Sequence, residues 1–397
     1  MKDLSGPSRI AAVPAVATLA GILALTGVAL TGGLLLGAAP PPEALAADVA
    51  RAHASHVLAE YRATLGAAES MRAAIRALCG SPDEATLARA RETWISAREI
   101  YGRTEAFRFG NGPIDTRQGG VETFLNAWPV DEAYIDVVEG SETGGIVANA
   151  AKYPALGRAI LRLHNQRGGE TNVCTGWHAI EFMLWGQDRS ETGPGTRPAT
   201  DFVDGRTPFA DRRREYLLEI TDLLCEDLEL LANAWRADQP NFRQRFEADP
   251  ILAVKAMLTG AALLTGFEMA GERLAVAYET RDQEEEHSCF SDTTHIDFRS
   301  NIRGVDAVVR GRGGPGLLEL VRAADPSRAT SLDAALAAAL LAVDAMPVPF
   351  DGAIRAADGT PQRAQLKAAL DALETLGEEL GRAGRTFGWS LPTEPQG

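Results

Sequence analysis

Residues 174–188 read CTGWHAIEFMLWGQD and place two ionisable side chains, His178 and Glu181, among large apolar side chains. The tryptophan, isoleucine, phenylalanine, methionine and leucine residues of this stretch are typical of a buried helix. A charge that is buried without a partner costs free energy, or its pKa shifts until the group is neutral. Either His178 and Glu181 therefore satisfy each other and a neighbouring group, or an ion lies between them. A metal ion is the first candidate.

The rest of the sequence predicts an all-α fold. Apolar residues recur at helical spacing in long blocks, and no segment shows the convincing alternation of apolar and polar residues that a half-buried strand needs. The blocks lie at about residues 48–78, 81–109, 209–237, 241–280, 315–323, 330–345 and 361–385. We expect two helical-bundle domains, over residues 47–205 and 206–397, joined by the irregular loop near residues 190–208.

The first 46 residues predict a targeting segment. Lys2 and Arg9 precede an apolar run over residues 11–39, which is followed by three prolines and by the small-x-small pattern Ala44–Leu45–Ala46. This order is typical of a secretory signal that is cleaved near Ala46. The apolar run is longer than a usual signal core, so an uncleaved membrane anchor is the alternative. Either reading predicts a periplasmic or cell-envelope protein.

The overall charge bears on the class of partner. The 397-residue chain has a formal net charge of -15 at pH 7. Such a charge disfavours nucleic acid and anionic membrane surfaces as the main partner and favours the gathering of cations.

Within residues 174–188, His178 and Glu181 are three residues apart and share one face of a helix. Together they can give two ligands to a transition-metal ion, and other segments must complete the shell. Gly176, just before the helix, would let a backbone segment or a ligand approach closely. The alternative is a buried His–Glu hydrogen bond that only holds two helices together. The H-E-x-x-H motif of zinc peptidases is absent.

Two further segments carry paired charges. Glu105 and Arg108 lie three residues apart between aromatic side chains, and Arg197 and Asp201 lie in the irregular TRPATDF loop. All four are candidate binding residues. The alternatives are a structural Arg–Glu ion pair for the first pair and ordinary solvated loop charges for the second.

A second dense cluster lies in EEEHSCFSDTTHIDF, residues 284–298. It contains four imidazole or carboxylate donors, namely His287, Asp292, His295 and Asp297, in a chain that has six histidines. Such donors could complete the shell of an ion held by His178 and Glu181. The alternative is an exposed acidic loop that ends in a helix cap.

The four cysteines become candidates for disulfides if the chain is exported. Cys174 directly precedes the His178 stretch and Cys289 lies in the second cluster, so a Cys174–Cys289 disulfide would join the two segments. Cys79 with Cys225 is the other pairing that we consider. No CxxC pair is present, which disfavours a structural zinc site.

Several of these stretches resemble one family. CTGWHAIEFMLWGQD resembles the G-x-H-x-x-E signature of imelysin-like proteins. Four more segments resemble those of the iron-regulated protein A branch of that family, and they follow the family's order: TEAFRFGNGPID, WPVDEAYID, GPGTRPATDF and EHSCFSDTTH. The resemblance extends from about Trp94 to Phe298. The last hundred residues resemble the family only in general character.

The resemblance implies an exported, two-domain, all-helical protein whose site lies in the cleft between the domains, with a link to bacterial iron acquisition. The family signature falls on Gly176, His178 and Glu181. The supporting cleft positions that we infer are Glu105, Arg108, Arg197, Asp201, Asp292 and His295.

The leading hypothesis is a metal-binding protein, with iron favoured over zinc. His178 and Glu181 would be the inner ligands, and Asp292 and His295 would complete the shell, because carboxylates with imidazole suit iron better than thiolate-rich sites do. A candidate partner is a membrane component of iron uptake. One alternative is a metallopeptidase in which Glu181 is the base or a ligand. Another is a metal-free binding module for a haem, a siderophore or a peptide.

Overall fold

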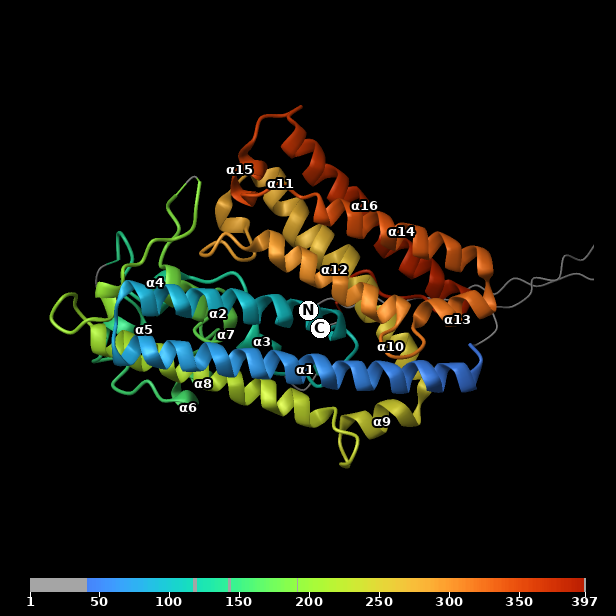
Figure 1. Cartoon of the computed structure of the whole chain (residues 1–397), viewed down its shortest axis with the longest axis horizontal. Helices are drawn as coiled ribbons and strands as arrows, with labels where there is room; N and C mark the ends of the chain where they lie inside the picture. Colours follow the sequence, from blue (N-terminus) through green and yellow to red (C-terminus); the bar gives the residue numbers. More distant parts are fainter. Residues whose placement is uncertain (1–40, 117–119, 142–143, 191, 396–397) are drawn as a thin grey trace, which may run out of the picture. The chain divides into compact units, whose positions relative to one another are not determined.

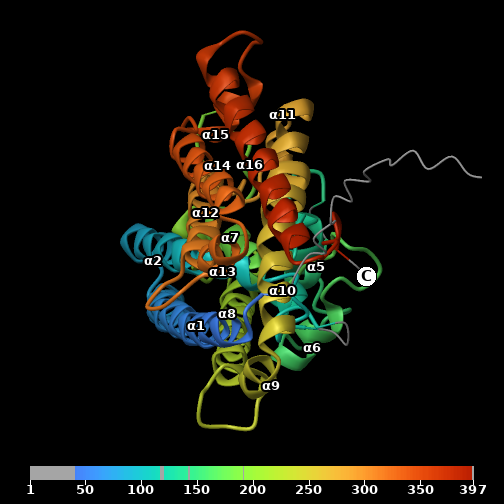
Figure 2. The ribbon, with the colours of Figure 1, turned by 90° about the vertical axis from the view of Figure 1, so that its right-hand side faces the viewer.

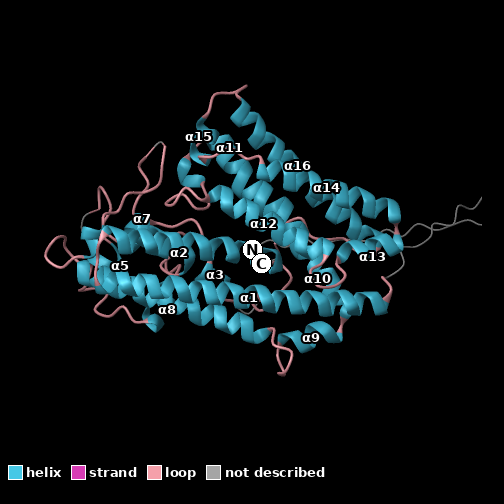
Figure 3. Cartoon of the chain, in the orientation of Figure 1, coloured by secondary structure: helices cyan, strands magenta, loops and turns pink. Residues whose placement is uncertain are grey.

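The computed structural model describes residues 41–116, 120–141, 144–190 and 192–395. Within these ranges every regular element is helical, apart from an isolated bridge between Val138 and Ser141. The prediction of an all-α fold is therefore confirmed (Figure 3).

The elements of the first half are α1 (Glu43–Gly80), α2 (Glu84–Gly102), η1 (Arg103–Phe107), α3 (Glu122–Leu125), α4 (Glu132–Ile135), α5 (Gly145–Ala148), α6 (Arg158–His164), α7 (Gly176–Trp185) and η2 (Ala199–Phe202). Those of the second half are α8 (Ala210–Ala234), α9 (Phe242–Ala248), α10 (Pro250–Ala262), the π-helix η3 (Leu263–Ala275), α11 (Val276–Thr280), η4 (Gln283–Glu285), α12 (Thr294–Arg310), α13 (Leu317–Ala324), α14 (Pro326–Asp344), α15 (Phe350–Arg355) and α16 (Pro361–Thr386).

Helices α1 and α2 form because their buried residues recur every three or four positions. In α1 the buried residues include Val57, Tyr61, Thr64 and Ala68, and this stripe packs against α2 and α8. A capping box starts α2, since the side chain of Asp83 accepts a hydrogen bond from the backbone N–H of Thr86. Its carboxylate oxygen lies 2.7 Å from that nitrogen.

The helices pack in two groups (Figures 1 and 2). The first contains α1, α2, α7 and α8, with the short helices α3–α6 around α7 and α8. The second contains α10 to α16, in which η3 and α14 pack against α16. The groups meet where α12 packs on α2 and η1, and where α10 packs on α1.

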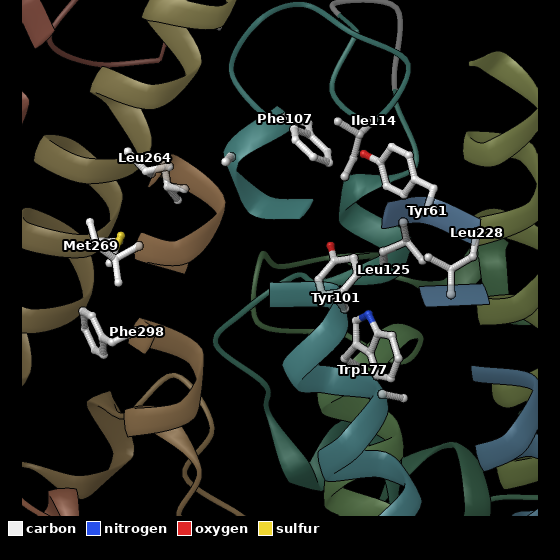
Figure 4. Packing of buried hydrophobic residues seen from close by; sticks show 14 of the residues in the cluster. Tyr61, Tyr101, Phe107, Ile114, Leu125, Trp177, Leu228, Leu264, Met269 and Phe298 are labelled. Atoms are coloured by element: carbon white, nitrogen blue, oxygen red, sulfur yellow. The ribbon is translucent and has the colours of Figure 1, made fainter. Parts of the chain in front are cut away.

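The predicted boundary at residues 205 and 206 does not coincide with these groups. That boundary assigns α8 to the second domain, whereas α8 packs against α1 and α7 in the first group. The described residues form one compact unit with a continuous hydrophobic core. Figure 4 shows Tyr101 and Trp177 of the first group, together with Met269 and Phe298 of the second.

The predicted N-terminal signal or anchor, residues 1–46, lies mostly outside the described residues. The described part begins just before α1 at Glu43, and Ala46, where we expect cleavage, is a buried residue of that helix. Cleavage there would remove the first turn of α1.

The segment over residues 250–280 is a nearly continuous apolar helix whose length and composition would also allow a membrane span. Here α10 packs against α1 and α16, and η3 packs against α16, so half of the most apolar stretch is buried in the core. In the π-helix η3 each turn is wider than in an α-helix, with bonds between residues five apart. Glu268 and Arg273, five residues apart, consequently face the same side, and their side chains lie 2.7 Å apart.

Two glycines let helices of the second group approach η1, the element that carries Glu105. A Cβ atom at Gly304 of α12 would lie 2.3 Å from the carbonyl oxygen of Arg103. A Cβ atom at Gly260 of α10 would lie 2.5 Å from the carbonyl oxygen of Arg108. Both contacts are to backbone atoms, which cannot move away as a flexible side chain can.

We predict that Gly304→Ala destabilises the protein by about 1–3 kcal/mol, because the added methyl group forces α12 away from η1. The matched control is Gly66→Ala in α1, where an added Cβ meets nothing within 4 Å. That change should stabilise the protein by roughly 0.4–1 kcal/mol, as alanine favours the helix. Urea denaturation followed by circular dichroism measures both, and a stabilising Gly304→Ala would contradict the close approach.

Candidate buried polar site

Helix α7 lies in the interior because nearly every one of its side chains is apolar, and all ten of its residues are buried. Its first residue, Gly176, has a φ of 87°, and a Cβ there would lie 2.4 Å from the carbonyl oxygen of Leu125. The close approach that we predicted at Gly176 is thus an approach of backbone. It seats α7 against α3 and thereby positions His178 and Glu181.

His178 and Glu181 form a hydrogen bond with each other, and Glu181 also accepts hydrogen bonds from a loop in the second half of the chain. Nδ1 of His178 lies 2.9 Å from Oε2 of Glu181. The other carboxylate oxygen, Oε1, accepts hydrogen bonds from the backbone N–H of Ser291 at 2.9 Å and from its hydroxyl at 2.7 Å. Glu181 is fully buried and His178 nearly so. The two segments that sequence analysis singled out therefore meet.

A third group, Arg98 of α2, lies at the centre of the cluster. Its Nε donates to Oδ1 of Asp297 at 3.0 Å, and its Nη1 donates to Oδ1 of Asn126. Its Nη2 lies 3.4 Å from Nε2 of His178 and 3.3 Å from Nδ1 of His287. Because a guanidinium can only donate hydrogen bonds, Nε2 of His178 is the acceptor. The ring hydrogen of His178 is therefore on Nδ1.

The environment sets the protonation of this cluster. Burial lowers the pKa of His178 well below its ordinary value, and the Arg98 charge lowers it further. Burial and the Arg273 charge lower the pKa of His287 to about 4. Both imidazoles are therefore neutral at pH 7. Burial raises the pKa of Glu181 to about 8, although the hydrogen bonds from Ser291 act in the opposite direction.

Asp297 is the ionised member of the cluster. Burial alone would raise its pKa, but Arg98 and the hydrogen bonds from His287 and Ser288 hold that pKa well below its usual range. Nδ1 of His287 lies 2.8 Å from Oδ2 of Asp297, and the Ser288 hydroxyl donates to the same oxygen at 2.6 Å.

The cluster continues into a second set of buried charges through Asn126, whose Nδ2 donates to Glu105 at 3.4 Å. Glu105 accepts from Arg108 and from Arg273, each at 3.0 Å. Both arginines also pair with Glu268. The Glu105–Arg108 pair of the sequence analysis is thus a buried ion pair that joins η1 to the π-helix. Burial would raise the pKa of Glu268, but Arg273 and Arg108 lower it to about 2.

This charged network ends at a cavity. Arg108 and its partner Glu122, 3.2 Å apart, line a cavity of about 620 Å³ beside α10. The network therefore connects His178 to a surface cavity through Arg98, Asn126, Glu105 and Arg108.

Two predicted ligands lie outside the cluster. The His295 side chain is only partly buried, and its pKa is lowered by burial and by the nearby Arg299. Asp292 lies among other carboxylates, and burial together with Asp188 and Asp351 raises its pKa to about 7.

The residues of segment 284–298 that reach His178 and Glu181 are instead His287, Ser291 and, through Arg98, Asp297. Helical spacing at the start of α12 decides this, because Asp297 faces α2 and His295 does not.

The loop pair Arg197 and Asp201 also lies elsewhere. Arg197 pairs with the fully buried Asp136 at 3.0 Å and with Asp201 at 3.3 Å, and Asp136 also pairs with Arg213 of α8. These side chains hold the chain that follows α7 against α8, and the Arg197 guanidinium lies over the ring of Phe182.

Four residues of the buried network were not predicted as site residues from the sequence, namely Arg98, Asn126, Glu268 and Arg273. Arg98 had a detectable signal, because it lies four residues after the buried Trp94 and three before the buried Tyr101. A charge on the buried face of a helix needs a partner, as His178 and Glu181 do.

The structure contradicts the predicted disulfides, since all four cysteines are free. Cys174 packs before α7, where its thiol lies 3.5 Å from the carbonyl oxygen of Leu161, whereas Cys289 lies beside Glu181 further along that helix. Cys79 lies against the carbonyl of Arg214. Cys225 is eleven residues further along α8, which corresponds to about 16 Å.

A family model described as imelysin matches residues 57–380. The chain belongs to the imelysin family. The resemblance inferred from the G-x-H-x-x-E signature is thereby confirmed. Because the match spans both groups of helices, the family relationship covers the whole buried network.

Two relatives of this imelysin-family chain carry the same name. An iron-regulated protein A of Synechococcus elongatus is 26% identical over 310 residues, which cover 74% of each chain. The crystal structure assigned as an iron-regulated protein A precursor from Parabacteroides distasonis has a TM-score of 0.67 and 18% identity, and covers 88% of this chain and 96% of that one. The second comparison shows a shared fold.

We predict that Arg98→Met destabilises the protein by about 3–5 kcal/mol, because it leaves Asp297 charged, buried and without its ion-pair partner. Adding Asp297→Asn should recover much of that loss, since the unpaired charge is then removed. Urea denaturation measures both variants. The control is Arg89→Ala, which removes an exposed pair with Glu92 and should change stability by about 0–1 kcal/mol. Equal effects of Arg98→Met and Arg89→Ala would contradict the central role of Arg98.

Proposed function

We propose that this imelysin-family protein is an exported metal-binding protein of bacterial iron acquisition, and that His178 and Glu181 are the inner ligands of the ion. The observation that supports this most is the composition of the buried cluster. It places two neutral imidazoles and two carboxyl groups around a position that already holds a positive charge, the guanidinium of Arg98.

The kind of donors fits an iron ion. Neutral imidazole and carboxylate together suit an iron ion. Thiolate ligands would instead favour copper(I) or structural zinc. The lowered pKa values of His178 and His287 keep both rings in the neutral form that binds metals. A cation that binds Glu181 near pH 7 would replace its proton.

The positions of the donors require the site to rearrange before it binds an ion. Within the described residues, no group of three or more His, Cys, Asp or Glu side chains surrounds a common point. Arg98 lies between the donors and contacts Nε2 of His178. Because two cations repel each other strongly in a site without water, an ion at His178 requires the Arg98 side chain to move.

The proposal of iron rests on the relatives, two of which are named iron-regulated protein A. The acidic net charge of -15 is consistent with cation gathering.

Binding explains the site better than peptide cleavage does. A hydrolytic metal site needs a base next to the metal-bound water. Both oxygens of Glu181 are engaged, one by His178 and the other by Ser291. Either role requires one of these hydrogen bonds to be given up. We assign Glu181 the role of a ligand, because an ion that replaces the hydrogen between Nδ1 of His178 and Oε2 of Glu181 would contact both groups.

Calorimetric titration of the purified chain with ferrous ion, under nitrogen, tests this proposal. We predict that wild-type protein binds one ion and that Glu181→Gln lowers the affinity by about 10-fold or more, because it removes an anionic ligand while preserving shape. His178→Ala should have a similar effect. Zinc in a parallel titration tests the preference for iron.

Asp292→Asn and His295→Ala are the matched controls, because both residues lie outside the cluster and should leave the affinity nearly unchanged. Absence of ion binding by wild-type protein would refute the proposal. Chelator-sensitive peptide cleavage that Glu181→Gln abolishes, with metal still bound, would show instead that the protein is a metallopeptidase.

A further inference from the structure

A separate part of the surface carries a concentration of arginines that the buried site does not use. It lies where the loop before α13 crosses α1, next to η1 and α12. Two adjoining cavities of about 540 and 390 Å³ are found there, and both are lined by His56 and Arg312. We call these two cavities the basic groove.

The smaller cavity has a strongly cationic lining. Besides His56 and Arg312, it is lined by Arg103, Arg303, Ala307 and Glu60. Glu60 is the one acid among them and is bound to Arg103 at 3.0 Å. The larger cavity adds Arg51 with its partner Asp48. The chain has a net charge of -15, so the positive charge of this lining is opposite in sign to the charge of the molecule as a whole.

Two of these arginines have charge that neighbouring acids leave largely uncompensated. Arg312 is exposed and has no side-chain hydrogen bond or ion pair to any residue in the described part of the chain. Arg303 is about half exposed and has only long contacts, 3.4 Å to Asp344 and 4.0 Å to Glu99. Exposed pairs of this kind contribute little energy, so Arg303 can exchange its partners for a ligand, and binding of a ligand by Arg312 breaks no ion pair.

The backbone holds Arg312 in place. It lies in the glycine-rich loop over residues 311–316, in which Gly311 and Gly313 have positive φ values of 83° and 70°. A Cβ at Gly314 would lie 2.7 Å from Cβ of Ala52, so the loop is pressed against α1. His56 in turn packs edge-on against Phe107, with 5.8 Å between the ring centroids.

We propose that the basic groove binds a small multivalent oxyanion, a polycarboxylate or a polyphosphate, with Arg312 and Arg303 as its main contacts. Guanidinium groups match carboxylate and phosphate oxygens in pairs, which gives strong, directional hydrogen bonds. The cavity volumes are those of small-ligand sites. The smaller cavity, which contains Arg303 and Arg312, is more enclosed than the larger one, which favours a compact ligand over a membrane surface. This proposal does not depend on metal binding by His178.

The test is calorimetric titration of the full chain with citrate and, separately, with pyrophosphate, with sodium chloride added to match the ionic strength. We predict binding of at least one of these anions by wild-type protein. Arg312→Ala should weaken it by about 10-fold or more, the usual effect of losing a charged hydrogen bond. The double change Arg303→Ala with Arg312→Ala should remove measurable binding.

Arg89→Ala is the matched control, because Arg89 is an exposed arginine on α2 outside the groove, and it should leave the affinity unchanged. Both groove arginines are exposed, so circular dichroism should show the native fold in every variant. Failure of wild-type protein to bind either anion, or binding that Arg312→Ala leaves intact, overturns the proposal. Binding to phosphatidylglycerol vesicles without binding to the soluble anions would identify a lipid surface as the partner and also overturn it.

Discussion

The ion pair between Arg98 and Asp297 is the interaction on which the buried site depends. The two residues are 199 positions apart in the chain and join α2 of the first group of helices to α12 of the second. Removing two charges from water is costly, and their attraction offsets that cost only when the remaining hydrogen-bonding atoms also find partners. Asn126, His178, His287 and Ser288 supply those partners. The geometry of this one pair therefore determines how four segments meet.

That pair also sets the chemistry of its neighbours. Burial keeps His178 and His287 neutral, the charges of Arg98 and Arg273 lower their pKa values further, and Arg98 keeps Asp297 ionised. The result is a buried cluster that has metal-type donors and a built-in cation. The neighbouring set, Glu105 with Arg108, Arg273 and Glu268, repeats this balance of charges next to a surface cavity.

The second set depends on an irregular helix. In an α-helix, residues five apart point in different directions, whereas the π-helix η3 turns Glu268 and Arg273 to the same side. Close contact with η1 also needs glycine at positions 260 and 304, because any Cβ there would meet backbone oxygen. The site is thus supported by departures from regular packing on both sides, which is common where polar groups are buried for function.

The sequence by itself determined the all-helical fold, the imelysin family and the buried position of His178 and Glu181, because helical periodicity and the G-x-H-x-x-E signature are local. It also indicated that residues 284–298 would meet them. Only the tertiary structure decided which members of that segment do so, selecting His287, Ser291 and Asp297 over Asp292 and His295. It likewise decided that α8 packs with α1, that the cysteines stay unpaired and that Arg98 lies at the centre. The physical reason is that the partner of a buried charge is set by contacts between distant segments, and local patterns of hydrophobicity carry no information on such contacts.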